Sequence, residues 1–376
     1  MNALKIFALS FKNNIFSFIL VILEISALLI AENYMICTLN EREMLNAAYY
    51  PVLTENSAFV YDMGGMYYDG TFRESRQNLL AKIPQNYKIY DTLIYSDGEI
   101  SIISVSDEIY ENLALPLSNG NYGDVNGGSV ATVNTKKGEN KVDFGDGAVL
   151  SLNVCGLLTS TTYLPEMNSN KSAEMTVSDF YINSINDKNI ILTSRSAIKG
   201  FEDKFSCTLG FIIEFDENAK DNLLQLNKSK AITIDASDII ANSDSALSED
   251  RASFFPLVMS IGIVVVIGIA CISVIIFKEN ERRNAVLWIC GYSRAGIIGV
   301  HTVGIALMTA LSVIISLAAF GLLKMFGNEM IVGVNLTFEN FIVTIITCAL
   351  LSAISSAVPA LNCRKISPAE NIRRAK

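Results

Sequence analysis

The stretch FFPLVMSIGIVVVIGIACISVIIF, residues 254–277, decides the fold class because no charged side chain interrupts it. A helix of about 20 such residues crosses the roughly 30 Å hydrocarbon core of a bilayer. Residues 15–31, 296–323 and 341–361 form three further apolar runs of this kind. The chain of 376 residues is 51% hydrophobic and 18% charged, with a mean hydropathy of +0.36, which is unusual for a soluble enzyme. The sequence therefore predicts a membrane protein with four transmembrane α-helices.

The charges are sorted along the chain. Residues 32–253 hold 32 acidic and 17 basic side chains, whereas the other segments are net basic. The basic residues near the four runs are Lys5, Lys12, Lys278, Arg282, Arg283, Arg294, Arg364, Lys365, Arg373, Arg374 and Lys376. Lys324 is the only basic residue between the third and fourth runs. Lys and Arg in short loops stay on the cytoplasmic side, so both termini are expected in the cytoplasm of a cell (plasma) membrane protein.

This sorting gives a complete expected organisation. Its parts are a cytoplasmic N-terminus (1–14), transmembrane helix 1 (15–31), an extracytoplasmic α/β domain (32–253), helix 2 (254–277), a cytoplasmic coupling segment (278–295), helix 3 (296–323), an external loop (324–340), helix 4 (341–361) and a cytoplasmic tail (362–376). A cleaved signal peptide is the alternative for the first run. Glu24 within that run, its length and the lack of an A-x-A cleavage site favour a retained helix.

The large polar segment is expected to form a mixed α/β or α+β domain in two lobes. Its β-branched and aromatic stretches predict strands at 58–62, 87–96, 99–106, 148–158, 189–194, 209–215 and 231–235. Leucines at helical spacing predict helices at 72–83 and 216–228. The Gly-, Asn- and Asp-rich residues 119–147 indicate hairpin loops, in preference to a calcium site, because DFGDG lacks the full set of oxygen ligands.

Enzymatic and nucleotide-binding motifs are missing from the sequence. The only histidine, His301, lies in the third apolar run, so a nucleophile with a histidine base is not expected in the polar domain. The seven cysteines show no metal-binding spacing, and Cys155 and Cys207 are either a disulfide or two free thiols. Because no G-x-x-x-x-G-K-[ST] motif occurs, the chain is expected to bind no cofactor itself, and any ATP must be bound by a partner subunit.

The segment KENERRNAVLWICGYSRAG, residues 278–296, suggests a short amphipathic helix at the membrane surface. Ala285, Trp288 and Ile289 share one face, with Glu281 and Arg282 among the polar residues. Gly291 is expected to end this helix in the left-handed conformation. Ser293, followed by Arg294, is expected to cap the next helix. A plain connecting loop is the alternative.

The C-terminal tail RKISPAENIRRAK, residues 364–376, contains a second helix signal. Ser367 is followed by Pro368 and then by Glu370, which together form a capping box with proline at the first helical position. A new short helix is therefore expected after the fourth apolar run, presenting Arg373 to the cytosol.

These two segments resemble those of the FtsX-like and MacB-like permeases of ABC transporters. Gly291 and Ser293 match the family's turn after the second helix, and Pro368 and Arg373 match its Pro-x-x-x-x-Arg ending. The resemblance implies a permease subunit that pairs with a second copy or paralogue. It also implies that the permease transmits the movement of a separate ABC ATPase to the extracytoplasmic domain, for export of peptides, lipids or antibiotics, for resistance, or for control of cell-wall hydrolases.

The coupling residues expected from this resemblance are Glu281, Arg282, Trp288, Gly291, Ser293, Arg294, Ser367, Pro368, Glu370 and Arg373. Glu24 is expected to contact another helix, to take part in a proton-linked step, or to be merely tolerated, because a carboxylate in hydrocarbon costs about 2.5–3.5 kcal/mol on insertion scales. The expected partners are the ATPase, the second permease, membrane lipid and an extracytoplasmic ligand or protein, with no nucleic acid. The competing hypothesis is a membrane-anchored receptor or scaffold that needs no ATPase.

Overall fold

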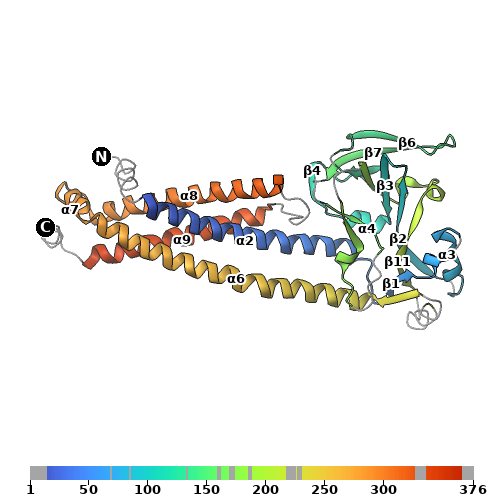
Figure 1. Cartoon of the computed structure of the whole chain (residues 1–376), viewed down its shortest axis with the longest axis horizontal. Coiled ribbons are helices and arrows are strands. Elements are labelled where there is room, and N and C mark those ends of the chain that lie inside the picture. Colours follow the sequence, from blue (N-terminus) through green and yellow to red (C-terminus); the bar gives the residue numbers. More distant parts are fainter. Residues whose placement is uncertain are drawn as a thin grey trace. The chain divides into compact units, whose positions relative to one another are not determined.

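The structure is a computed structural model of the whole chain (Figure 1). It describes residues 15–67, 70–83, 86–132, 134–158, 162–168, 174–184, 189–216, 226, 231–326 and 336–365. The chain divides into two compact units. The helical unit contains residues up to Thr38 and from Arg251 onward, and the α/β unit contains Leu39–Asp250. The expected fold class is confirmed, because a mixed α/β domain lies between the first and second of four membrane-type helices.

The helical unit is built from long apolar helices. They are α2 (Ile15–Tyr49), α6 (Ala236–Glu279), α8 (Arg294–Phe326) and α9 (Phe338–Lys365), with the short α7 (Glu281–Ile289) between α6 and α8. Within the described residues, these four long helices are each long and apolar enough to cross a membrane. The chain is therefore a multi-pass membrane protein.

Two of these helices are longer than their apolar runs. The distal part of α2, from Leu39 onward, and the part of α6 before Arg251 belong to the α/β unit. Pro256 lies well inside α6, and the helix continues past it to Glu279. Ile25, Leu29 and Ile269 lie in the buried core of the helical unit.

The α/β unit contains one large sheet, with strand order β12-β1-β11-β2-β3-β10-β5-β7-β4 and with β6 paired to β7. The bounds are β1 Ser57–Asp62, β2 Tyr87–Ser96, β3 Ile100–Val105, β4 Leu117–Gly120, β5 Gly128–Ala131, β6 Gly138–Asp143, β7 Val149–Leu158, β10 Asn189–Ser194, β11 Ser206–Phe215 and β12 Ala231–Asp235. Strand β3 pairs with β10 in parallel, as does β5 with β7, and the other pairs are antiparallel.

The remaining elements of the unit are short. They are β8 (Thr162–Pro165) with β9 (Tyr181–Ser184), α3 (Phe72–Leu80), α4 (Asp107–Asn112) and the 3-10 turns at Gly65–Tyr67, Val177–Phe180, Ser196–Ile198 and Glu202–Lys204. The expected division into two lobes stays a prediction, because the chain divides only once and one sheet runs through the α/β unit. The predicted helix at 216–228 lies almost entirely outside the described residues.

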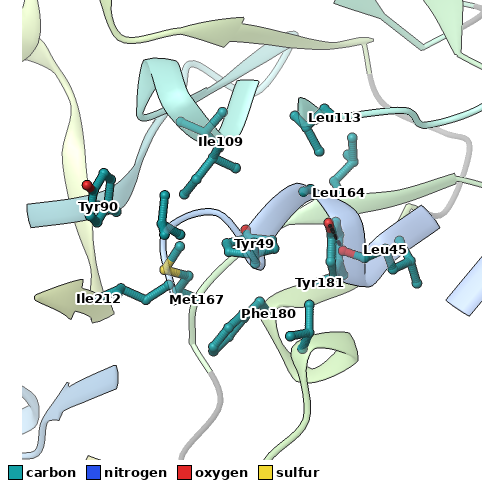
Figure 2. Close-up of a cluster of buried hydrophobic side chains, with 14 of the residues drawn as sticks. Leu45, Tyr49, Tyr90, Ile109, Leu113, Leu164, Met167, Phe180, Tyr181 and Ile212 are labelled. Carbon is teal, nitrogen blue, oxygen red and sulfur yellow. Dashed lines mark hydrogen bonds between the residues drawn. The ribbon is translucent and has the colours of Figure 1, made fainter. Parts of the chain in front are cut away.

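Successive side chains of a strand point to opposite faces, so the sheet has two buried faces. On one face Phe59 and Ile212 pack with Tyr49 of α2 and Ile109 of α4 in a large apolar cluster. Figure 2 labels Ile212, Tyr49 and Ile109 among its members. On the other face Val60, Phe211 and Ile213 pack with Leu79 and Leu80 of α3. Strand β1 is buried along its whole length because both faces are covered.

Candidate functional site

The segment between α6 and α8 has the geometry expected of a capped helix–turn–helix. Helix α7 ends in a turn in which the Tyr292 amide donates to the Leu287 carbonyl at 3.0 Å. Gly291 lies between them with a φ of +88°, in the left-handed region. The Ser293 hydroxyl accepts from the Gly296 amide at 3.1 Å, which caps the start of α8. The backbone geometry expected for Gly291 and Ser293 is therefore present.

The orientation of α7 differs from the expected one. Asn280, Asn284 and Leu287 are buried, at positions i, i+4 and i+7 that share one helical face. Val286 and Ile289 are instead 56% and 70% exposed. The inner face of this segment is thus mainly polar, and two apolar side chains lie on its outer side.

The predicted apolar face is therefore wrong in part. Ala285 is buried, but Ile289, which was expected beside it, is the most exposed of the large apolar residues of α7 that the structure describes. The backbone of Trp288 is helical, and its side chain lies outside the described part. The exposed Val286 and Ile289 are available to a partner surface or to lipid.

Helix α7 is attached to the membrane helices by one apolar cluster, and a small cavity lies beside it. Leu287 packs with Phe277 of α6 and with Ile297 and Val300 of α8. A cavity of about 30 Å³ is lined by Arg283 of α7, Ser273 of α6 and His301 of α8, among other residues. Its lining is mainly apolar, but it has room for one or two water molecules that Ser273, Arg283 and His301 can bind. His301 is half-buried, with its ring centroid 5.4 Å from that of Phe277.

Other predicted coupling residues are only partly described. Glu281 begins α7, and Arg282 and Arg294 lie in helical backbone without a described side chain. The residues of the C-terminal motif, Ser367, Pro368, Glu370 and Arg373, lie outside the described residues. The structure thus brings together Gly291 and Ser293 in one turn and places Glu281 at the other end of α7. The role of all these residues stays a prediction.

Glu24 lies between two membrane helices. A Cβ placed on Gly268 of α6 would lie 2.5 Å from Oε2 of Glu24 and 2.9 Å from its Cδ. The glycine therefore leaves the space that the carboxyl group occupies, as small residues do where membrane helices approach closely. Of the roles considered for Glu24, contact with a neighbouring helix has this direct geometric support.

Sequence reasoning missed a set of hydrogen bonds between α2 and the last two helices. The Asn340 amide of α9 donates to Oδ1 of Asn33 at 3.0 Å, and the Asn33 amide donates to the Thr344 hydroxyl at 3.0 Å. The Thr347 hydroxyl donates to Glu32 at 2.8 Å. A further bond runs from the Ser312 hydroxyl of α8 to the Ile22 carbonyl at 3.1 Å. We call this set the interhelical polar ladder.

The sequence contains a signal for this ladder. The first apolar run stops at residue 31 and the fourth begins at residue 341, so Asn33 and Asn340 fall just outside the runs and read as loop residues. Both are buried in helices. A hydrogen-bonding residue one turn beyond an apolar run could therefore have been considered as a helix contact.

The α/β unit contains a cluster of three buried or half-buried charges. Asp91 on β2 forms ion pairs with Arg76 of α3 and with Arg195. The Arg76 guanidinium also donates to the Thr208 carbonyl and lies 4.6 Å from the ring centre of Phe211. The cluster joins α3, β2 and β11, so its geometry indicates a structural role.

Among the described residues, no group of three or more His, Cys, Asp or Glu side chains could hold a metal ion. Cys155 and Cys207 are free thiols, so the disulfide alternative is not present in the structure. Burial raises the pKa of the Cys207 thiol, which disfavours the reactive thiolate.

Comparison with known protein families gives no match, and comparison with curated proteins gives none either. Among solved structures, the chain is similar to the periplasmic region of MacB from Actinobacillus actinomycetemcomitans at 9% sequence identity. The alignment covers 50% of this chain and 92% of that one, with a TM-score of 0.24. A similarity this low assigns neither a family nor a function, which must be argued from the chain's own residues.

Proposed function

We propose that the chain is the permease subunit of an ABC transporter complex of the FtsX-like or MacB-like class. The observation that carries the proposal is the capped turn at Gly291 and Ser293, between the second and third membrane helices of a chain whose α/β unit lies between the first and second. These two residues also match the family's turn, as Pro368 and Arg373 match its C-terminal ending.

In this proposal the chain binds no nucleotide and catalyses no reaction. A separate ATPase binds ATP and docks on residues 279–294 and 366–374, with both termini in the cytoplasm. The exposed Val286 and Ile289 offer it an apolar contact. The attachment of α7 to α6 and α8 through Leu287 passes the movement to the membrane helices.

The movement then reaches the extracytoplasmic α/β unit through α2 and α6, which enter it without an interruption in the helix. A second permease, either another copy or a paralogue, completes the complex. The output is the export of a peptide, lipid or antibiotic, a resistance response, or control of a cell-wall hydrolase. Such transmission needs no polar path for substrate between the helices, which fits the apolar runs 254–277, 296–323 and 341–361.

The experiment that tests the proposal replaces Gly291. A Cβ there would meet no atom within 4 Å, so a substitution acts through backbone strain alone. A β-branched residue with a positive φ costs roughly 1–2 kcal/mol. Asparagine tolerates this conformation much better. Gly291→Val should therefore distort the turn, and Gly291→Asn is the matched control.

Tagged full-length protein is purified in mild detergent, its partners are identified by mass spectrometry, and ATP hydrolysis is measured. We expect a P-loop ATPase to co-purify with the wild type and with Gly291→Asn. Gly291→Val should lose the ATPase, or its stimulation, at least severalfold while the chain stays folded. Recovery without any ATPase in several detergents, or full activity of Gly291→Val, would favour the receptor or scaffold hypothesis instead.

A further inference from the structure

A second cavity lies among α2, α8 and α9 and is separate from the turn at Gly291. Its volume is about 290 Å³, close to the lower limit for small-molecule pockets in proteins. Helix α8 contributes Val313 and Leu317 to its lining, and α9 contributes Phe341, Ile345 and Cys348. The cavity therefore follows the line along which α8 and α9 pack together.

The chemistry of the lining selects a neutral, apolar occupant. None of the described residues that line the cavity is charged, and its walls are mainly hydrocarbon. Its polar end is formed by Asn33, Thr337, Asn340 and Thr344, which are bonded to one another. Because these groups satisfy each other, the walls offer little to water, and apolar cavities of this kind stay dry and bind apolar molecules.

The cavity opens toward the bilayer. Leu317, Phe341 and Ile345 line it and are each more than half exposed, whereas Ser316 at its inner side is buried. Both helices carry candidate membrane spans, so hydrocarbon surrounds this mouth. A molecule inside would be contacted by three helices, unlike a lipid that touches only the outer surface of the bundle.

The length of the cavity matches one leaflet. Its lining on the α9 side extends from Thr337 to Cys348, which is about 16 Å at 1.5 Å per residue. The hydrocarbon core of a bilayer is about 30 Å thick, so each leaflet contributes about half of it. This is the depth that one acyl chain covers, and a much longer polyprenyl chain would not fit.

We propose that this cavity binds one acyl chain of a membrane phospholipid. The chain lies between α8 and α9 with its end near Cys348, and the glycerol and headgroup lie beyond Thr337, outside the cavity. The lipid is thus a bound component of the helical unit. This inference is independent of the ATPase proposal, since it uses only the cavity and the polar ladder beside it.

Two neighbouring isoleucines provide a matched test. Ile345 lines the cavity and is 52% exposed, and Ile346 is 53% exposed but does not line it. Ile345→Trp should fill the mouth of the cavity, whereas Ile346→Trp adds the same bulk on the helix surface. Both variants and the wild type are purified at full length in detergent, and retained phospholipid is counted by native mass spectrometry.

We expect one phospholipid per wild-type chain, the same within twofold for Ile346→Trp, and at least a fivefold loss for Ile345→Trp. The wild type is also illuminated with a phosphatidylethanolamine that carries a diazirine at its acyl end. Adducts should concentrate at residues 313–317 and 341–348, above those on the exposed Ile263, Val264 and Ile267 of α6. This second measurement does not depend on the folding of a variant.

Three results would overturn the proposal. The first is a wild type that retains no phospholipid and shows uniform adducts along α6, α8 and α9. The second is equal retention of lipid by the two tryptophan variants. The third is displacement of the phospholipid by an equimolar polyprenyl phosphate, which would assign the cavity to a different lipid.

Discussion

Replacing Gly128 with alanine tests how closely two backbone segments of the α/β unit must approach. Gly128 begins β5, and Gly123 lies before the turn that leads into it. A Cβ on Gly128 would lie 2.1 Å from the Cα of Gly123 and 2.4 Å from its carbonyl carbon. Carbon atoms in contact are normally about 3.5–4.0 Å apart, so the two segments would have to separate by more than about 1 Å.

The cost should be large because no side-chain rotation can relieve this clash. Overpacking typically costs about 1–3 kcal/mol, and more when the backbone must move. Separation would also disturb the bond from the Tyr110 hydroxyl to the Gly128 carbonyl, at 3.0 Å, and the pairing of Gly128 with Asn153. We expect a loss of about 3 kcal/mol, which lowers Tm by roughly 6–12 °C for a unit of this size.

The neighbouring glycine is the control. A Cβ on Gly127 would meet no atom within 4 Å, so Gly127→Ala should change stability by less than about 0.5 kcal/mol. The assay is thermal unfolding of the full-length protein in detergent, followed by limited proteolysis of the α/β unit. A Tm for Gly128→Ala within about 2 °C of that for Gly127→Ala would refute the reasoning.

Three further changes test other parts of the structure. Asp91→Asn leaves the buried Arg76 and the half-buried Arg195 without their carboxylate and should cost about 3 kcal/mol in urea unfolding. The exposed Asp203→Asn should cost under about 1 kcal/mol. Equal effects of the two changes would contradict a structural role for the cluster. Burial raises the pKa of Glu41 in the α/β unit to about 7 from its usual 4.5. The stability that the protonated Glu41 contributes is therefore fully present below pH 4.5 and is lost as the pH rises through 7. Glu41→Gln should make Tm depend less on pH between 4.5 and 7, and an unchanged dependence of Tm on pH would contradict this role. Asn340→Leu removes two hydrogen bonds to Asn33 and should destabilise the helical unit by about 1–2 kcal/mol in detergent. Unchanged unfolding of this variant would show that the interhelical polar ladder contributes no stability.

The four membrane helices are predictable from the sequence because the bilayer imposes a simple length and polarity test. Their ends are less predictable. Leu45 and Tyr49 at the end of α2, and Ile239 near the start of α6, are buried in the α/β unit among polar neighbours in the sequence. Hydropathy locates the lipid-facing part of a helix, whereas tertiary packing decides how far the helix continues.

Strand prediction succeeded where the residues are β-branched or aromatic, as in β2 and β10. It missed β4, β5 and β6, whose sequences LSNG, GSVA and GENKVD have little intrinsic preference for strands. These strands form because β7 and β10 provide neighbouring edges for pairing. The tight approach of Gly123 and Gly128 has a similar tertiary origin.

The candidate site was predictable in its backbone and not in its orientation. Glycine and serine preferences identify the turn at Gly291 and the cap at Ser293. The buried face of α7 is set by its connection to α6, since the Asn284 amide donates to the Asn280 carbonyl and the Asn280 amide to Ile276. This short connection buries Asn280 and Asn284, although the apolar periodicity of α7 predicts that Ile289 lies on the buried face.

The most direct test of the proposed coupling role is photo-crosslinking from the exposed face of α7. The photoreactive p-benzoylphenylalanine is placed at Ile289 in cells, with Ile263 on the exposed face of α6 as the control position. The account predicts an adduct at Ile289, absent at Ile263, whose partner contains a G-x-x-x-x-G-K-[ST] sequence by peptide mass spectrometry. Adducts at Ile289 with lipid alone, or with a second copy of this chain alone, would contradict it.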